Sequence, residues 1–369
     1  MPFWSAAEPL DGQTGSLTST GFGLYSGMAG IGVFAAELAR QSDDKEFVGL
    51  AQACRKGVRL GLDSGAYGLG AFNGASGLLY AEICMALSLG ERPGRELLPY
   101  FAALERFVDH DTVFDIIGGV AGTGILALRA SRIEGLEPLS SLAVRCGTRL
   151  MQGAVADENS GGVRWPSPQG GSALAGFAHG AAGNAAALAL IGAATDDQAM
   201  RALAWSGLRF ARQGYDGSRD VWVEEQAPDA KSDVAGSMAW CHGTPGKVIA
   251  GQIVRSALAS ADPVCPTDHE RRGLRACADR LSEGNDSLCH GILGNLEPLL
   301  GAETADRRLA TDVAHAVAER GHAGEYRCSI GGGRNPGLML GLAGMGHQLL
   351  RISGARAANV LRLELPDHD

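Results

Sequence analysis

The sequence predicts an all-α fold, an α/α toroid (barrel) in which seven inner helices are ringed by seven outer helices. Three observations predict this class. Glycine supplies 54 of the 369 residues, about twice its usual share. The glycines recur in seven G-x-x-G motifs, each followed by an apolar run. Apolar and amphipathic segments then alternate along the chain, as buried and surface helices do.

The G-x-x-G motifs divide the chain into seven repeats. They read SGMAGIGVFAAEL, NGASGLLYAEICMAL, GGVAGTGILALRA, HGAAGNAAALALIG, HGTPGKVIAGQIV, HGILGNLEPLL and LGLAGMGHQLLRI, and their first glycines are Gly27, Gly74, Gly119, Gly180, Gly243, Gly291 and Gly341. Successive first glycines lie 45 to 63 residues apart, which is room for two helices and their loops. Glycine at each start permits a tight turn and close packing of backbones.

The helical segments are of two kinds. Those after the motifs, such as AAGNAAALALIGAA, are apolar on nearly every side, which predicts helices buried all round. Between motifs, DDQAMRALAWSGLRFARQG and ADRRLATDVAHAVAER alternate apolar and charged residues at helical spacing, which predicts surface helices. An open solenoid needs polar end repeats, but the first and last repeats here are as apolar as the others. We therefore expect the two ends to meet.

The chain is expected to form one domain over residues 21–355, after an N-terminal extension (1–20) and before a C-terminal tail (356–369). The net charge of −9 argues against nucleic acid or an anionic membrane as the main partner. The N-terminus lacks the basic and apolar regions of a secretory signal, and no run is apolar enough for a membrane span. Eight dispersed cysteines indicate reduced thiols and a cytoplasmic protein.

Candidate metal ligands stand directly before the G-x-x-G motifs of the fifth and sixth repeats. In both repeats a cysteine and a histidine precede the first glycine, which gives the triplet CHG. Equivalent positions of neighbouring repeats are expected to face the same rim, so Cys241, Cys289 and His290 form a plausible zinc set. Three protein ligands leave the fourth tetrahedral position open, as in catalytic zinc sites. Sulfur and nitrogen ligands favour zinc over magnesium or calcium, and one Zn²⁺ per chain is expected. The alternative is that both cysteines are buried small apolar side chains.

Two further histidines share this register. His179 has no cysteine beside it, so proton donation is a more natural role for it than metal coordination. His242 is a candidate second donor or a substitute third ligand, and either histidine could be purely structural. Asp115, four residues before Gly119, could orient a histidine or share its proton, although a lone acid at a helix start is often an N-cap. These three residues are the candidate catalytic groups.

The remaining cysteines are assigned mostly to the core. Cys328 precedes the seventh repeat in a loop that could approach the same rim, and it is left without a role. Helical contexts predict core positions for Cys54, Cys84, Cys146 and Cys277, whereas Cys265 lies between two prolines and is expected in a loop.

The sequence resembles the lanthionine synthetase C-like family, the lanthipeptide cyclases, over about residues 20 to 355. The segments that carry this resemblance are GFAHGAAG, WCHGTPG, CHGILG and the closing NPGLMLGLAGMGHQLLRI. The resemblance implies an α/α toroid with zinc bound by Cys241, Cys289 and His290. It implies that His179 is the acid/base histidine and that Asp115 is the family's conserved aspartate. The implied reaction adds a peptide cysteine thiol to dehydroalanine or dehydrobutyrine, which forms a lanthionine or methyllanthionine thioether ring in a ribosomal peptide.

The sequence departs from the stand-alone cyclases of this family at two positions. Those cyclases carry an arginine four residues before the first zinc cysteine and a tyrosine just after it, where this chain has Ser237 and His242. The WCHG-x-PG form is similar to cyclase domains of bifunctional lanthipeptide synthetases, but the large dehydratase region of those enzymes is missing here. Two expectations stay open, that the chain is part of a larger synthetase or that it is a separate protein. The expected partners are a dehydrated precursor peptide and, in the second case, a separate dehydratase.

Three other functions fit parts of the pattern. A non-catalytic protein could bind zinc and the thiol of glutathione or a peptide without closing a ring. A thiol-alkylating enzyme resembling the prenyltransferases would need an acidic zinc ligand, which has no counterpart here. An α/α-barrel glycosidase would need a pair of carboxylates, and only Asp115 lies near the motif rim.

Overall fold

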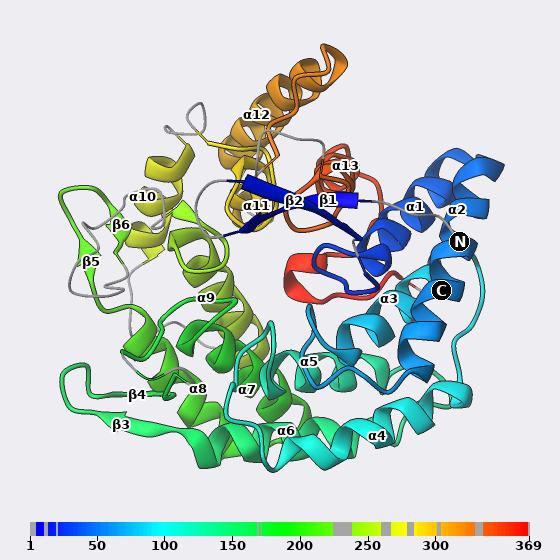
Figure 1. The fold of residues 1–369 in the computed structure, drawn as a ribbon. Helices are drawn as coiled ribbons and strands as arrows, with labels where there is room; N and C mark the ends of the chain where they lie inside the picture. The colour runs from blue at the N-terminus through cyan, green and yellow to red at the C-terminus, as the bar shows by residue number, and fades with distance from the viewer. Residues whose placement is uncertain are drawn as a thin grey trace. The chain divides into compact units, whose positions relative to one another are not determined.

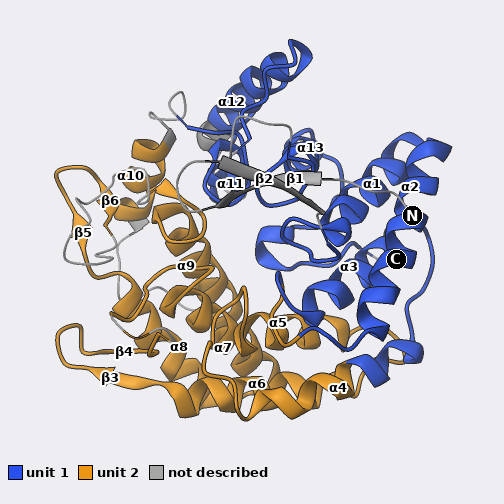
Figure 2. Ribbon diagram, viewed as in Figure 1, with its two compact units in different colours: residues 1–67, 72–100, 283–369 blue, residues 68–71, 101–282 orange. Residues whose placement is uncertain are grey.

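The computed structural model describes residues 5–10, 14–19, 21–167, 170, 172–223, 238–259, 267–278, 284–300, 304–328 and 335–367. Within these residues the chain forms thirteen α-helices and three two-stranded antiparallel hairpins (Figure 1). It divides into two compact units (Figure 2). Unit 1 comprises residues 1–67, 72–100 and 283–369, and unit 2 comprises residues 68–71 and 101–282.

Unit 2 contains the third, fourth and fifth motifs. Its helices α5, α7 and α9 follow these motifs and are buried along most of their length, whereas α8 buries one face. The elements are α4 (Leu98–Val108, which begins in unit 1), α5 (Val120–Ala130), α6 (Leu139–Gly153), β3 (Val155–Asp157), β4 (Gly162–Arg164), α7 (Ala181–Thr195), α8 (Gln198–Ala211), β5 (Tyr215–Asp216), β6 (Val221–Trp222), α9 (Thr244–Leu258) and α10 (Thr267–Ala278).

Unit 1 contains the first, second, sixth and seventh motifs. The helix after the sixth motif, α11, is only four residues long, because Pro298 lacks the amide hydrogen that a continuing helix needs. The elements are β1 (Ser5–Leu10), β2 (Thr14–Ser19), α1 (Met28–Ser42), α2 (Lys45–Asp63), α3 (Ala75–Ser88), η1 (Arg95–Leu97), α11 (Ile292–Asn295), η3 (Glu297–Leu299), α12 (Thr304–His322), α13 (Leu342–Ile352) and η4 (Val360–Arg362).

The first glycine of every motif is the N-cap residue of a helix: Gly27, Gly74, Gly119, Gly180, Gly243, Gly291 and Gly341 precede α1, α3, α5, α7, α9, α11 and α13. The second glycine, three residues later, has a steric reason. A Cβ atom at Gly122 would overlap the carbonyl oxygen of Ile116, six residues earlier, and the same relation holds at Gly246 and Trp240. The G-x-x-G spacing therefore lets the loop fold back onto the first helical turn.

Backbone hydrogen bonds join the loops of neighbouring repeats. In unit 2, the amide of Ile117 donates to Ala178 (3.4 Å) and that of Ala178 to Cys241 (3.0 Å). In unit 1, the amide of Tyr25 donates to Phe72 (3.1 Å) and that of Met339 to Tyr25 (2.9 Å). Because this last bond joins the seventh repeat to the first, and α13 packs on α1, the expected meeting of the two end repeats is confirmed.

The expected seventh outer helix is absent from residues 353–367, where the described chain forms only the short helix η4. This segment instead packs along unit 1. The amide of Ala358 donates to Oε1 of Glu37 (3.1 Å), and the hydroxyl of Tyr80 donates to the carbonyl of Glu364 (2.7 Å). Glu37 belongs to α1 and Tyr80 to α3, so these two bonds attach the C-terminal segment to α1 and α3.

Candidate active site

The candidate residues occupy equivalent places before the N-cap glycines of α7, α9 and α11. His179, His242 and His290 each stand one residue before the glycine, and Cys241 and Cys289 stand two residues before it. His179, Cys241 and His242 belong to unit 2 together with Asp115, whereas Cys289 and His290 belong to unit 1.

Asp115 and His179 are in direct contact within unit 2. Oδ2 of Asp115 lies 2.7 Å from Nδ1 of His179, and Oδ1 accepts the amide of Gly118 at 2.7 Å. Asp115 is buried, with 8% of the residue exposed, whereas the side chain of His179 is 37% exposed. Since an ionised carboxylate only accepts, it places the ring proton on Nδ1 and leaves Nε2 to exchange a proton.

The alternative role of Asp115 as the N-cap of α5 does not fit the structure. Asp111 provides the capping carboxylate, because its Oδ2 accepts the amides of Phe114 and Val120, each at 2.9 Å. Asp115 is therefore available to orient His179. Asp111 lies nine residues before Val120, the first residue of α5, so no local capping pattern in the sequence points to it.

His242 stacks on His179. The ring centroids lie 5.3 Å apart and the planes are inclined by 20°. The loop of His242 is held by the bond from the Ala178 amide to the Cys241 carbonyl. Gly180, directly after His179, has a φ angle of 130°, which favours glycine over any residue with a side chain.

Gly176 is a further residue that shapes the site. A Cβ atom there would overlap the carbonyl oxygen of Cys241 and would lie 2.9 Å from Cα of His242. The absence of a side chain at this position therefore permits the loops before α7 and α9 to lie against each other. The signal in the sequence is the glycine three residues before His179 in GFAHG.

The two cysteines of the register are buried, with Cys241 7% and Cys289 3% exposed, whereas His290 is exposed. The loop before α11 is fixed by backbone bonds, since the Cys289 amide donates to the Met339 carbonyl at 2.9 Å. Two thiols and one imidazole are a donor set suited to zinc. Burial of the two thiols is compatible with a metal site and with apolar packing.

The other cysteines behave as core residues where they are described. Cys54, Cys84, Cys146 and Cys277 are at most 3% exposed, which confirms their predicted core positions. Burial raises the pKa of Cys54 to about 12, so this thiol stays protonated and inert at neutral pH. Cys328 is half-buried, with its sulfur 3.9 Å from the Asn335 carbonyl oxygen. Cys265 and Ser237 lie outside the described residues.

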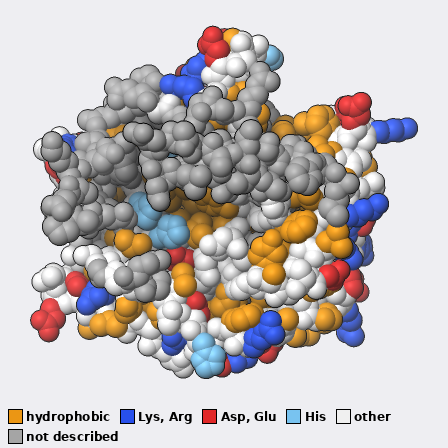
Figure 3. Space-filling model, viewed as in Figure 1, with side chains coloured by type: hydrophobic (Ala, Val, Ile, Leu, Met, Phe, Trp, Pro, Cys, Tyr) orange, Lys and Arg blue, Asp and Glu red, His pale blue; other side chains and the backbone are white. Residues whose placement is uncertain are grey.

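Histidine side chains also reach the molecular surface next to hydrophobic side chains, as the pale blue and orange atoms of Figure 3 show. Among the described residues, every helix is too short or too polar to traverse a lipid bilayer.

The chain belongs to the lanthionine synthetase C-like protein family, whose model matches residues 18–365. A solved structure named nisin cyclase has the same fold, with a TM-score of 0.70 over 93% of this chain and 92% of that chain, at 16% sequence identity. This likeness confirms the predicted all-α class, the α/α toroid. A search of curated proteins gives no match.

Proposed function

We propose that this protein is a zinc-dependent peptide cyclase. It adds the thiol of a peptide cysteine to a dehydroalanine or dehydrobutyrine of the same peptide and so forms a thioether ring. Family membership over residues 18–365 supports this reaction class. The observation that carries the proposal is the contact between Asp115 and His179, which supplies an oriented acid beside the cysteine of the fifth repeat.

Cys241, Cys289 and His290 are the proposed zinc ligands. Each offers one ligand atom, and two sulfurs with one imidazole nitrogen form the usual open set of a catalytic site. A zinc ion bound there would hold the substrate cysteine as a thiolate at neutral pH, since coordination releases the thiol proton.

His179 is the proposed acid of the second half of the reaction. The substrate sulfur attacks the β-carbon of the dehydroamino acid, and the electron pair of the double bond moves toward the adjacent carbonyl as an enolate. Nε2 of His179 then gives a proton to the α-carbon. The imidazole regains a proton equivalent to the one lost by the thiol, so the peptide is isomerised and no co-reactant is consumed.

Asp115 orients His179. The carboxylate is itself fixed, because Oδ1 accepts the Gly118 amide while Oδ2 faces Nδ1. The arrangement is that of a base oriented by a buried acid, as in hydrolytic triads. The amide groups in the first turn of α7, which begins at Ala181, favour negative charge such as that of the enolate.

The substrate of this reaction is a precursor peptide that already carries dehydrated serine or threonine residues. A dehydratase activity must therefore act on the peptide first. The exposed edge of His179 and the exposed His290 are the groups proposed to meet the peptide.

Metal analysis tests the ligand assignment. The protein should hold about one zinc per chain, and Cys241→Ala and Cys289→Ala should each lose it. Cys328→Ala is the matched control and should keep it, because this thiol is half-buried outside the motif register. Full zinc retention in both ligand variants would refute the assignment.

A ring assay tests the activity. A synthetic peptide with one dehydroalanine and one cysteine is incubated with the protein and then treated with a thiol-alkylating reagent. Ring closure leaves the peptide mass unchanged and prevents alkylation, whereas a protein that merely binds the thiol releases an alkylatable peptide. Uniform alkylation at the no-enzyme level would contradict the cyclase function and favour non-catalytic thiol binding.

A further inference from the structure

We propose that His242 is a positioning residue, whose ring holds His179 by stacking and so fixes the direction in which His179 delivers its proton. This inference rests on the proposed function for its catalytic consequence. Its structural basis, the stack of the two rings at 5.3 Å and 20°, stands independently of that function.

The contact with Asp115 alone leaves the His179 ring incompletely fixed. The covalent bond to Cβ and the hydrogen bond at Nδ1 each fix one side of the ring. Small rotations about the Cβ–Cγ bond that keep this hydrogen bond within range still tilt the ring and move Nε2. With the His179 side chain 37% exposed, packing on its solvent side restrains this tilt only partly. A flat partner against one face removes the remaining freedom, since a ring cannot tilt without leaving the stack.

His242 is well placed to be that partner because its own backbone is restrained. The carbonyl of the preceding Cys241 accepts the amide of Ala178 at 3.0 Å, and the amide of the following Gly243 donates to Ala239 at 2.7 Å. Gly176 packs against the same peptide, with its would-be Cβ 2.9 Å from Cα of His242. The residue before His179 and the residue before His242 are thus bonded to each other, and the two rings face each other across that bond.

The consequence for the reaction is geometric. An enolate is flat at its α-carbon and can take a proton on either face. The face that is protonated follows from where Nε2 lies, and misplacement of a catalytic group by about 1 Å can slow a reaction about 100-fold. A fixed ring therefore gives both a faster proton transfer and a product with one configuration at the α-carbon.

The competing role for His242 is that of a second proton donor. The two roles require different properties of the side chain. Stacking needs an aromatic face and no exchangeable proton, whereas proton donation needs the imidazole nitrogens. Phenylalanine supplies the first property without the second, and alanine supplies neither.

The experiment compares His242→Phe and His242→Ala in the full-length protein. Zinc content and melting temperature establish that both variants fold. With the dehydroalanine and cysteine peptide as probe, His242→Ala should close rings roughly 10- to 100-fold more slowly and give a mixture of α-carbon configurations in the lanthionine recovered by hydrolysis. His242→Phe should recover most of the rate and the single configuration. If His242→Phe is as slow as His242→Ala, or if His242→Ala is unchanged, the stacking role is wrong.

A second measurement does not depend on activity. In histidine-labelled protein, the ring carbon-bound proton signal of His179 is identified by its loss in His179→Ala. The stack should displace this signal by the ring current of its neighbour in the wild-type protein and in His242→Phe. In His242→Ala it should move to the position of an exposed histidine. An unmoved signal would overturn the proposal, whatever the ring assay shows, while a moved signal with no ring closure would fault the cyclase function alone.

Discussion

Nδ1 of His179 and Oδ2 of Asp115 lie 2.7 Å apart although 64 residues separate them in the chain. The two residues stand in the loops before α7 and α5, which are themselves joined by the bond from the Ile117 amide to the Ala178 carbonyl. The side-chain contact therefore follows from the way neighbouring repeats pair their loops. Backbone groups also restrain the two residues, because the Gly118 amide donates to the Asp115 carboxylate and Ala178, next to His179, accepts the Ile117 amide.

Asp115→Asn should lower ring formation by about 10²- to 10⁴-fold while zinc content and melting temperature stay near those of the wild-type protein. Asparagine keeps the shape of the side chain but supplies no negative charge, and its amide group can also hold the wrong ring tautomer. The rate of thioether formation with the model peptide measures the effect. Asp109→Asn is the control and should leave the rate unchanged, because within the described residues this exposed carboxylate pairs only with Arg145. Equal rates for Asp115→Asn and the wild-type protein would exclude an orienting role.

Gly122→Ala should destabilise the fold by about 2 kcal/mol or more, because the new Cβ would overlap the carbonyl oxygen of Ile116 and would lie 2.7 Å from Cβ of Ala71. Gly49→Ala should act in the opposite direction. Gly49 is exposed within α2 and has open space around it, so alanine gains about 1 kcal/mol in helix propensity. Chemical denaturation of both variants checks the pair, and a stabilised Gly122→Ala would contradict the steric account of the motif.

His347 should make the protein less stable as the pH falls below about 6.5. It is fully buried in α13, where neither ring nitrogen has a hydrogen-bond partner among the residues that the structure describes. Burial, with a smaller effect of Arg351, lowers its pKa to about 3. The unfolded chain therefore takes up a proton below its ordinary pKa of 6.5 while the folded protein does not, and stability is lost from pH 6.5 down to pH 3. Each pH unit in this range costs about 1.4 kcal/mol, so about 2 kcal/mol is lost by pH 5.

His347→Leu removes this effect and tests it. Urea denaturation at pH 6.5 and pH 5 should show a difference between the two pH values that is about 2 kcal/mol smaller in His347→Leu than in the wild-type protein. The control is His110→Gln, which changes an exposed histidine and should leave the difference as it is. An unchanged pH dependence in His347→Leu would show that His347 is charged in the folded protein.

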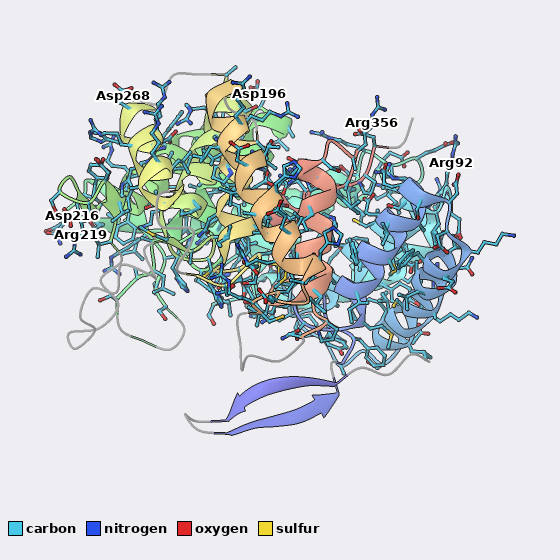
Figure 4. The ribbon with its side chains drawn as sticks, turned by 90° about the horizontal axis from the view of Figure 1, so that it is seen from above. Arg92, Asp196, Asp216, Arg219, Asp268 and Arg356 are labelled. Atoms are coloured by element: carbon cyan, nitrogen blue, oxygen red, sulfur yellow. The ribbon has the colours of Figure 1, made fainter. Side chains whose placement is uncertain are left out.

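Glu270→Gln should destabilise the protein by about 3 to 5 kcal/mol. Glu270 is 5% exposed and its carboxylate meets Arg212 and Arg255, so the neutral side chain would remove a buried negative charge that both guanidinium groups face. Asp196→Asn is the comparison. Asp196 pairs with Arg201 at 2.8 Å but is 83% exposed and points outward on the surface (Figure 4), so its loss should cost at most about 1 kcal/mol. Equal melting temperatures for Glu270→Gln and the wild-type protein would contradict this prediction.

The glycines made most of the fold predictable. A G-x-x-G motif requires glycine for a local reason, the overlap of a Cβ with the carbonyl six residues earlier, so the helix starts are visible without knowledge of distant contacts. The meeting of the first and last repeats was equally predictable, because neither repeat carries a polar outer face. Pro298 already signalled the end of α11, whereas the missing seventh outer helix depended on side chains such as Glu37 and Tyr80 that capture the chain end.

The site was predictable in its register but not in its contacts. His179 and His242 could be singled out because each stands directly before an N-cap glycine. Their stacking could not be predicted, because it depends on Gly176 and on the tilt of two loops, and no local sequence pattern specifies that tilt. Asp115 looked like a helix cap until Asp111 was found to occupy that role. The union of Cys241 with Cys289 and His290 around one zinc ion stays a prediction, and metal analysis decides it.

The hydrogen bond between Met339 and Tyr25 joins two parts of the chain that are synthesised far apart in time. Helix α1 leaves the ribosome before all the other helices in Figure 1, and α13, the helix packed beside it, leaves after all of them. The apolar surface of α1 that packs against α13 must therefore stay uncovered, or be shielded by a chaperone, until α13 has been synthesised. Nascent chains that stall before α13 is made therefore expose this apolar surface and are prone to aggregate.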